Sequence, residues 1–261
     1  MVYLDMNYVG IDMGSTCTKV IVMDEDQKII FYKVMPTGWN CIETSQTILD
    51  LLAEQGIKRE NFKCVATGYG RISVPYMDKA VTEISCHGKG ACYLFKEEDF
   101  TVVDIGGQDT KVIEISKGAV KNFNMNDKCS AGTGKFLEIM AATLGLDLNA
   151  LCELSRESKN HIVISSMCTV FAESEVVSLI GRGTEKADIA YGVVDSIVNK
   201  VHGQLGKIAG QSQIVRLTGG LCEAPYILEA LSKKLGTEVK SDPMARYAGA
   251  IGAALYATSL K

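Results

Sequence analysis

The N-terminal part of the chain consists of short apolar runs separated by turn-forming residues. An apolar run at 8–12 leads through Gly-Ser-Thr into a second run, and Asp-Glu-Asp separates the second run from a third. This spacing predicts a meander of β-hairpins. The next segment instead has apolar residues at helical spacing, including Ile48 and Leu52, and ends at Gly56. We predict strands at 8–12, 18–23, 28–35 and 63–67, and helices at 43–55 and 82–95.

The same pattern begins again at Phe100. The segment GIDMGSTCTKVIVMD at 10–24 aligns with VVDIGGQDTKVIEIS at 102–116, so that Asp12 falls on Asp104 and Gly14 on Gly106. A single internal repeat of this length predicts two similar domains, not a solenoid. We predict strands at 100–105, 110–115, 119–125 and 213–218, and helices at 135–144, 149–155, 171–180, 189–208, 224–235 and 245–258.

The length of 261 residues allows two modest domains. We expect an N-terminal lobe at 1–98 and a second lobe at 99–244, with the closing segment 245–261, rich in small residues, packed back on the first lobe. A hydrophobic content of 47% and a charged content of 22% are typical of a folded globule. The fold class is therefore α/β with a duplicated domain.

The two hairpin turns have the chemistry of phosphate sites. Each has an aspartate at a strand end, followed by glycine, which lets the backbone approach an anion so that successive N–H groups surround it. Facing each other, the two turns would hold the β and γ phosphates of a nucleotide. In this prediction, the phosphate-binding residues are Gly14, Ser15, Thr16, Cys17, Lys19, Gly106, Gly107, Gln108 and Asp109.

The acidic residues of the turns predict a hydrated Mg²⁺ held by Asp12, Asp104 and Asp109, because carboxylates are ligands of this ion. Gln108 is placed to orient the attacking water, so Asp12, Asp104 and Gln108 are the catalytic candidates. For Lys19 and Lys111, phosphate neutralisation and an exposed strand lysine are equally good interpretations. Cys17 is as well explained by packing.

A third glycine site follows a strand, in Leu217-Thr218-Gly219-Gly220-Leu221. Gly219 and Gly220 are suited to backbone approach to a ribose or adenine. The segment CSAGTGKF at 129–136 has a P-loop spacing, but Cys replaces the first glycine and Phe the final Ser or Thr. Two aligned turns together with a Thr-Gly-Gly therefore favour nucleotide binding of another kind.

Charge and cysteine usage exclude several classes. A net charge of −4 without a Lys/Arg run argues against nucleic acid. We expect no membrane span, because the chain has no apolar stretch of about 18 residues. The acidic N-terminus predicts no export, and therefore a cytoplasmic location. Nine cysteines, an odd number without a CxxC, argue against both a disulfide framework and a zinc ribbon.

The chain closely resembles the activator ATPases of 2-hydroxyacyl-CoA dehydratases, in the BadF/BadG/BcrA/BcrD family of the acetate and sugar kinase/Hsp70/actin superfamily. The resemblance runs nearly end to end. It implies an actin-like ATPase fold with two duplicated RNase H-like domains around a nucleotide cleft. The motifs that carry it are GIDMGSTCTKV, ATGYGR (66–71), TEISCHGKGA (82–91), DIGGQDTKV, MNDKCSAGTGKFLE (125–138), ISSMCTVFAESEV (164–176) and AGAIGAALYA (248–257).

The resemblance also implies a cofactor and partners. Members are homodimers with one [4Fe–4S] cluster between the subunits, and the motif match assigns its ligands to Cys129 and Cys168. ATP hydrolysis to ADP drives one low-potential electron into a partner iron–sulfur dehydratase in anaerobic metabolism, with ferredoxin or flavodoxin as the donor. The loop Gly132-Thr133-Gly134 is expected to reach the nucleotide. Since four thiolates are needed, two cysteines suffice only if a two-fold axis duplicates them.

Three alternatives remain open at this stage. The same ATPase type serves benzoyl-CoA reductases and double-cubane cluster proteins, which changes only the electron acceptor. A small-molecule kinase of the same superfamily would need neither Cys129 nor Cys168. A filament-forming actin-like protein would polymerise with ATP, although this chain is short for that role.

Overall fold

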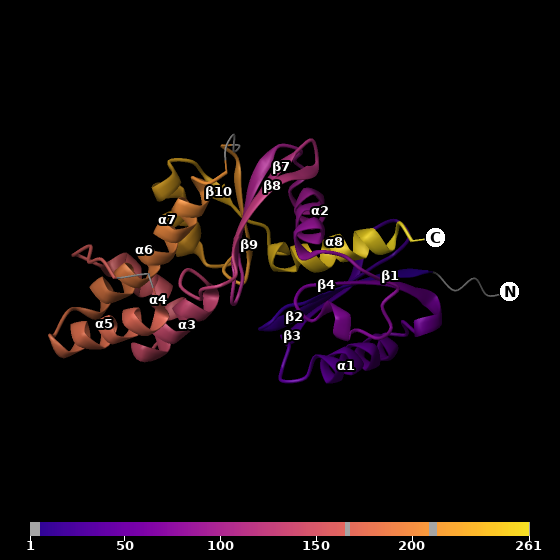
Figure 1. The fold of residues 1–261 in the computed structure, drawn as a ribbon, viewed down its shortest axis with the longest axis horizontal. Helices are drawn as coiled ribbons and strands as arrows, with labels where there is room; N and C mark the ends of the chain where they lie inside the picture. The colour runs from indigo at the N-terminus through magenta and orange to yellow at the C-terminus, as the bar shows by residue number, and fades with distance from the viewer. Residues whose placement is uncertain (1–5, 165–167, 209–212, 261) are drawn as a thin grey trace. The chain divides into compact units, whose positions relative to one another are not determined.

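The computed structural model describes residues 6–164, 168–208 and 213–260. The described chain divides into two compact units (Figure 1). The first contains the chain up to Glu98, the short segment Lys117–Val120 and the C-terminal segment from Arg246. The second contains Asp99–Ser116 and Lys121–Ala245. The C-terminal helix thus belongs to the same unit as the N-terminal strands.

The first unit is built on a five-stranded sheet in the order β3-β2-β1-β4-β5. Strands β1, β2 and β3 form the antiparallel meander, and β4 lies parallel to β1. Its core gathers the apolar side chains of these strands and of α1, including Val9, Ile11, Ile48 and Leu52. The elements are β1 (Asn7–Met13), β2 (Cys17–Met23), β3 (Ile29–Pro36), α1 (Cys41–Glu54), η1 (Arg59–Asn61), β4 (Phe62–Thr67), η2 (Arg71–Ser73), β5 (Lys79–Ala80) and α2 (Glu83–Phe95).

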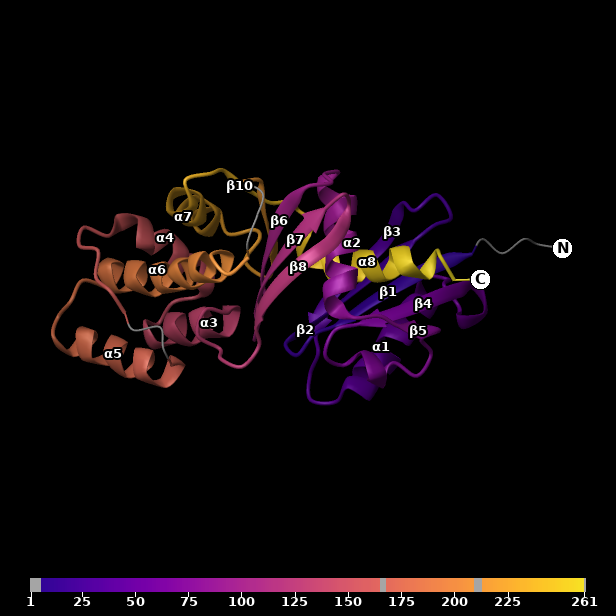
Figure 2. The same cartoon turned by 45° about the horizontal axis from the view of Figure 1, so that its top comes forward.

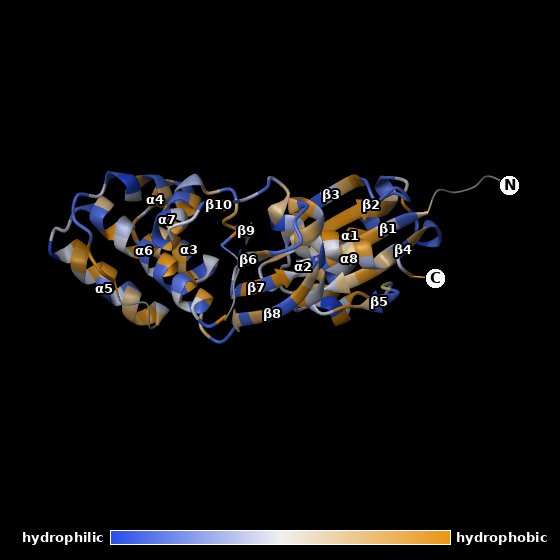
Figure 3. Cartoon of the chain, turned by 90° about the horizontal axis from the view of Figure 1, so that it is seen from above, coloured by the Kyte–Doolittle hydropathy of each residue, from blue (hydrophilic) through white to orange (hydrophobic). Residues whose placement is uncertain are grey.

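Helix α8 (Ala248–Ala257) packs against β1 and α2 (Figures 1 and 2). Its small side chains allow this close approach. A Cβ atom at Gly90 would overlap the Ala248 carbonyl oxygen, and one at Gly252 would overlap the Cys86 carbonyl oxygen. Hydrophobic residues concentrate on the central strands of this unit (Figure 3). The sequence AGAIGAALYA is therefore a packing surface for β1 and α2.

The second unit repeats this sheet, with the order β10-β9-β6-β7-β8. Strand β6 pairs antiparallel with β7 and parallel with β9, as β1 does with β2 and β4. The registers also match, since Asp12 pairs with Lys19 in β1–β2 and Asp104 pairs with Lys111 in β6–β7. The strands are β6 (Phe100–Ile105), β7 (Thr110–Ser116), β8 (Ala119–Asn126), β9 (Val215–Gly219) and β10 (Val239–Lys240).

Between β8 and β9 the second unit inserts several helices where the first has mainly α1. Helix α6 crosses the centre of this core and contributes Ile189, Val193, Ile197 and Val201. The helical segments of the unit are α3 (Gly134–Thr143), α4 (Leu148–Leu154), η3 (Ser155–Glu157), α5 (Thr169–Gly181), α6 (Lys186–Leu205) and α7 (Pro225–Leu235), and η4 (Ala245–Tyr247) precedes α8.

The element types match the hydrophobic pattern, and the differences lie at the ends. The helix predicted at 189–208 begins one turn earlier, at Lys186, because the charged first turn hides its apolar face. The helix predicted at 245–258 starts as the 3-10 turn η4. Strands β5 and β10 escaped prediction because two residues are too few to show a period.

Candidate nucleotide site and cysteine loops

The first predicted turn joins β1 to β2. Asp12 is 6% exposed, and its Oδ2 lies 3.6 Å from Nζ of Lys19, its cross-strand partner. The turn closes through a 3.2 Å hydrogen bond from the Gly14 amide to the Cys17 carbonyl. Ser15, at its tip, is exposed. The predicted phosphate-binding residues of this half therefore lie together on one tight turn.

Glycines from distant segments surround the Asp12 carboxylate. Gly68 follows β4 with φ +84°, and a Cβ there would lie 2.7 Å from Asp12 Oδ1 and 2.6 Å from the Met13 carbonyl oxygen. Gly249, in the first turn of α8, would place its Cβ 2.8 Å from Asp12 Oδ2. These two positions exclude side chains, so they leave room beside the carboxylate. Sequence reasoning assigned no role to either glycine.

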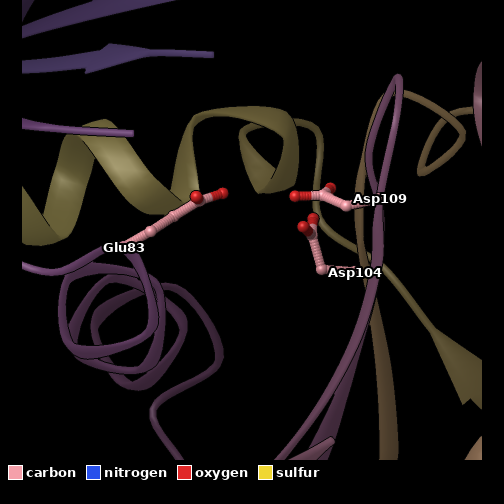
Figure 4. Close-up of side chains that lie close together, drawn as sticks. All are labelled: Glu83, Asp104 and Asp109. Carbon is pink, nitrogen blue, oxygen red and sulfur yellow. The ribbon is translucent and has the colours of Figure 1, made fainter. Parts of the chain in front are cut away.

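The second predicted turn joins β6 to β7 and contains a buried cation. Lys111 is 1% exposed, and its Nζ lies 3.1 Å from Asp104 Oδ2 and 2.8 Å from Asp109 Oδ2. Figure 4 shows the two carboxylates pointing to the same side of the turn. Glu83, also drawn there, belongs to the other unit. Lys111 is therefore not an exposed strand lysine, because two aspartates bind its ammonium group.

The backbone of this second turn is tied to the start of α3. The amide of Gly134 donates to the Gly106 carbonyl at 2.9 Å, and the amide of Lys135 donates to the Gly107 carbonyl at 2.8 Å. The Thr110 hydroxyl donates to the Gly132 carbonyl at 2.5 Å. The loop containing Gly132, Thr133 and Gly134 is thus hydrogen-bonded directly to the turn. Gln108, at the tip, is exposed.

The Thr-Gly-Gly segment after β9 lies beside Asp104. The Thr218 hydroxyl donates to Asp104 Oδ1 at 3.0 Å, and the Gly220 amide donates to the Ile105 carbonyl at 3.1 Å. Gly219 has φ +89°, and a Cβ there would lie 2.7 Å from Asp104 Oδ1. The segment therefore supports the aspartate of the second turn.

This arrangement extends the internal repeat. Thr67 lies opposite Asp12 in the β1–β4 register, as Thr218 lies opposite Asp104 in β6–β9. Each threonine precedes a glycine with positive φ that faces the aspartate, Gly68 in one unit and Gly219 in the other. The shared Ala/Leu-Thr-Gly at 66–68 and 217–219 was the sequence signal that could have revealed this correspondence.

The two candidate cluster cysteines lie on neighbouring loops of the second unit. Cys168 is the N-cap residue of α5, and Cys129 precedes the turn that leads into α3. Both are half-buried. The residue after each one joins the two loops, because the Ser130 and Thr169 hydroxyls are hydrogen-bonded at 2.8 Å. Part of the second motif, at 165–167, lies outside the described residues.

Other cysteines have environments that suit a neutral thiol. Cys64, Cys86, Cys152 and Cys222 are buried. Burial raises the pKa of Cys86 to about 12 and that of Cys152 to about 11, and it also raises the pKa of Cys64. A metal-bound sulfur is a thiolate, so these sites are poor ligands. The half-buried pair at the helix starts fits iron–sulfur ligation better, since helix N-termini stabilise negative charge.

The donor sets also fit a magnesium ion unequally. The Asp12 carboxylate has one lysine at 3.6 Å and space beside Gly68 and Gly249. The Asp104 carboxylate instead has Lys111 on one oxygen and Thr218 on the other. Carboxylate oxygens are preferred Mg²⁺ ligands, so Asp12 is the better-prepared ligand.

These two related sheets, each with an Asp-x-Gly turn between its first strands, define an actin-like ATPase fold. Solved structures agree. The (R)-2-hydroxyglutaryl-CoA dehydratase component A of Acidaminococcus fermentans aligns with a TM-score of 0.89 at 41% identity, covering 97% of this chain and 98% of that one. A glucokinase of the ROK family from Streptomyces griseus aligns with a TM-score of 0.60 at 14% identity, covering 97% and 98%, which supports the fold alone.

The chain belongs to the BadF/BadG/BcrA/BcrD ATPase family, whose model matches residues 9–257. The (R)-2-hydroxyglutaryl-CoA dehydratase activating ATPase of A. fermentans is 41% identical over 95% of this chain and 96% of its own length. The 2-hydroxyisocaproyl-CoA dehydratase activator of Clostridioides difficile is 37% identical over 97% and 95%. Its structure with bound ADPNP aligns with a TM-score of 0.88, covering 97% and 95%. A component of the benzoyl-CoA reductase of Thauera aromatica is 32% identical over 79% and 75%.

The expected absence of a membrane helix can be compared with the fold. Among the helices in the described part of the chain, none combines the length and the apolar character needed to cross a bilayer.

Proposed function

We propose that this chain is an ATP-hydrolysing activator that delivers single electrons to a partner iron–sulfur enzyme, a (R)-2-hydroxyacyl-CoA dehydratase. One observation carries the proposal beyond the family likeness. The second phosphate turn is hydrogen-bonded to the loop that follows Cys129, and the Ser130–Thr169 bond joins that loop to the one bearing Cys168. A change in the turn is thereby passed to both cysteines.

In this proposal the two turns bind nucleotide phosphates through their backbone amides. Gly14, Ser15 and Thr16 act in one turn, and Gly106 and Gly107 in the other. Asp12 and Asp104 position hydrated Mg²⁺, and Asp12 has more open space beside it. Gln108 orients the attacking water from its exposed position at the turn tip. Lys111 keeps Asp104 and Asp109 ionised and fixed, because its ammonium group bridges them.

Cys129 and Cys168 would hold a [4Fe–4S] cluster together with the same two cysteines of a second copy. When bound, the cluster supplies a low-potential single-electron carrier, reduced by a ferredoxin or flavodoxin. The chain's own contribution is to present two thiolates at helix starts, where the backbone amides stabilise negative charge. A homodimer follows from this proposal because one chain offers two ligands and a cubane needs four.

Anaerobic purification tests the cofactor. We expect iron and acid-labile sulfide at about four atoms per dimer in the wild type, as the cluster type requires. Cys129→Ser and Cys168→Ser should lose iron while their ATP hydrolysis continues. Cys92→Ser is the matched control, because this α2 thiol contacts only the Gly118 carbonyl and its hydroxyl replacement can do the same. Iron retained in both ligand variants would contradict the assignment.

A second assay tests the activator role. Reduced wild-type protein and MgATP should switch on a purified 2-hydroxyacyl-CoA dehydratase, and Asp104→Asn should abolish that effect together with ATP hydrolysis. ATP hydrolysis that survives this substitution unchanged would contradict the nucleotide assignment. Phosphorylation of a sugar or acid, independent of both cysteines, would favour a kinase instead.

Benzoyl-CoA reductase offers a second candidate acceptor, because a component of the Thauera aromatica enzyme is similar over 79% of this chain. The two candidates share the nucleotide and cluster chemistry and differ only in the partner. Incubating the reduced protein and MgATP with each purified partner separates them, since electron transfer should reach only the natural acceptor at a useful rate.

A further inference from the structure

We propose that Thr37 is a positioning residue for nucleotide binding, which sets the direction of the backbone amides in the first phosphate turn. Thr37 follows β3 and is outside both motifs that the sequence identifies as phosphate-binding. It is 2% exposed, so it acts through the turn and does not touch the nucleotide. This inference rests on the proposed nucleotide site.

Thr37 contacts the turn at two points. Its hydroxyl donates to the Gly14 carbonyl at 2.6 Å, and its amide donates to the Thr16 carbonyl at 3.0 Å. The two bonds bracket Ser15, which is the exposed tip of the turn. One residue therefore holds the turn on both sides of its tip.

The Thr37 hydroxyl is itself held in one orientation. It lies 2.9 Å from the Thr18 hydroxyl, and its single proton is used toward Gly14. Thr18 must therefore donate to Thr37, because a hydroxyl has one proton to give. The Thr44 hydroxyl, in the first turn of α1, donates to the Thr37 carbonyl at 2.5 Å. These contacts fix Thr37 between β2 and α1.

The geometry of the peptide bond links these contacts to ligand binding. In a planar trans peptide the C=O of one residue and the N–H of the next point in opposite directions. When Thr37 holds the Gly14 carbonyl, the Ser15 amide points away from Thr37. An anion site made of backbone amides needs such a fixed direction, so the hydroxyl orients the proposed phosphate contact without reaching it.

The second unit supports this interpretation with a different donor. There the carbonyls of Gly106 and Gly107 accept from the amides of Gly134 and Lys135 at the start of α3. Both turns thus have two of their carbonyls occupied by the protein. In the first turn one of the two donors is a side chain, so a substitution can remove it.

Equilibrium binding of a fluorescent ATP analogue with Mg²⁺, together with steady-state ATP hydrolysis, tests the proposal. Thr37→Val should weaken analogue binding and raise KM for ATP by about tenfold, because the Gly14 carbonyl loses its partner. The change in kcat should stay within about threefold, since no group that contacts the reacting atoms is altered. Thr37→Ser should return both values to within about twofold of wild type.

Thr47→Val is the matched control. This threonine lies on the exposed side of α1 and its hydroxyl bonds only the Glu43 carbonyl, so nucleotide binding should not change. Amide hydrogen exchange without nucleotide supplies a second readout, and residues 13–17 should exchange faster in Thr37→Val than in wild type. If Thr37→Val does not fold, Thr37→Ala removes the same hydroxyl without adding bulk and takes its place.

Normal ATP binding and unchanged exchange in a folded Thr37→Val protein would overturn the inference alone. Failure of Thr37→Ser to restore binding would also overturn it, because then the hydroxyl is not what matters. Wild-type protein that neither binds nor hydrolyses ATP would instead overturn the proposed function, and this inference with it.

Discussion

The two phosphate turns share their strand register but differ in how they are held. In the first, Lys19 keeps 22% of its side chain exposed and lies 3.6 Å from one carboxylate. In the second, Lys111 is 1% exposed and contacts two carboxylates at 3.1 Å and 2.8 Å. Thr218 adds a hydrogen bond to Asp104, whereas among the described residues Thr67 gives none to Asp12.

This difference shows that duplicated elements can take separate tasks. The second turn is rigid, because its ions, its hydroxyl donor and the start of α3 all hold it. It is also the turn joined to the cysteine loops, so rigidity suits the transmission of a change. The first turn keeps open space beside Asp12, which suits a ligand site. Four predictions test this division.

The largest effect is expected at Lys111. Lys111→Met leaves two aspartates close together without their buried cation, which should destabilise the protein by about 3–5 kcal/mol. Lys19→Met removes a partly exposed ion pair and should cost less than about 1 kcal/mol. Urea unfolding of both variants measures the contrast. Equal losses would show that the two turns are held alike.

A smaller contrast is expected between the paired threonines. Thr218→Val removes a hydrogen bond to a buried carboxylate, which should cost about 2 kcal/mol. Thr67→Val replaces a buried hydroxyl that makes no such bond to a carboxylate, so it should be neutral or slightly stabilising. Thermal melting of the two variants measures both effects. A large loss in Thr67→Val would mean that its hydroxyl supports Asp12 after all.

A third prediction concerns the loop that leads toward Cys168 in the second unit. Asp188 accepts hydrogen bonds from the Lys159 and Asn160 amides, and these bonds lower its pKa to about 2. Because the folded pKa is below the unfolded value, the stabilisation is present above pH about 4 and is lost as the pH falls through about 2.

Asp188→Asn should therefore lower the melting temperature at neutral pH. The gap between variant and wild type should narrow as the pH falls toward 2, where the wild-type carboxyl also becomes neutral. A gap that stays constant down to that pH would show that the carboxylate charge contributes nothing.

The smallest effect is expected in the thiols that pack each unit. The pKa is raised to about 12 at Cys86 in the first unit and about 11 at Cys152 in the second. Raised values mean that stability is full below the unfolded pKa of about 8.5 and declines as the pH rises through 11 to 12. Iodoacetamide labelling of the folded protein should therefore leave both thiols intact at pH 8, and Cys152 should begin to react at a lower pH than Cys86.

Much of this architecture was predictable from the chain alone. The hairpin repeat, the helix types and the ATPase fold follow from Asp12 and Asp104 at strand ends and from apolar periods of two and 3.6 residues. The support around the turns was not predictable. Gly68, Gly249 and Thr37 lie near the first turn only after β4, α8 and β3 have packed.

What the sequence determined by itself was local: which segments become strands or helices, and where glycines let the backbone turn beside an aspartate. Periodicity and turn chemistry act over a few residues, so they can be recognised without knowing what packs nearby. Only the tertiary structure decided that Lys111 is buried between two carboxylates while Lys19 stays partly exposed, because burial depends on segments far away in the chain. The same holds for the Ser130–Thr169 bond, which joins loops that no local pattern connects.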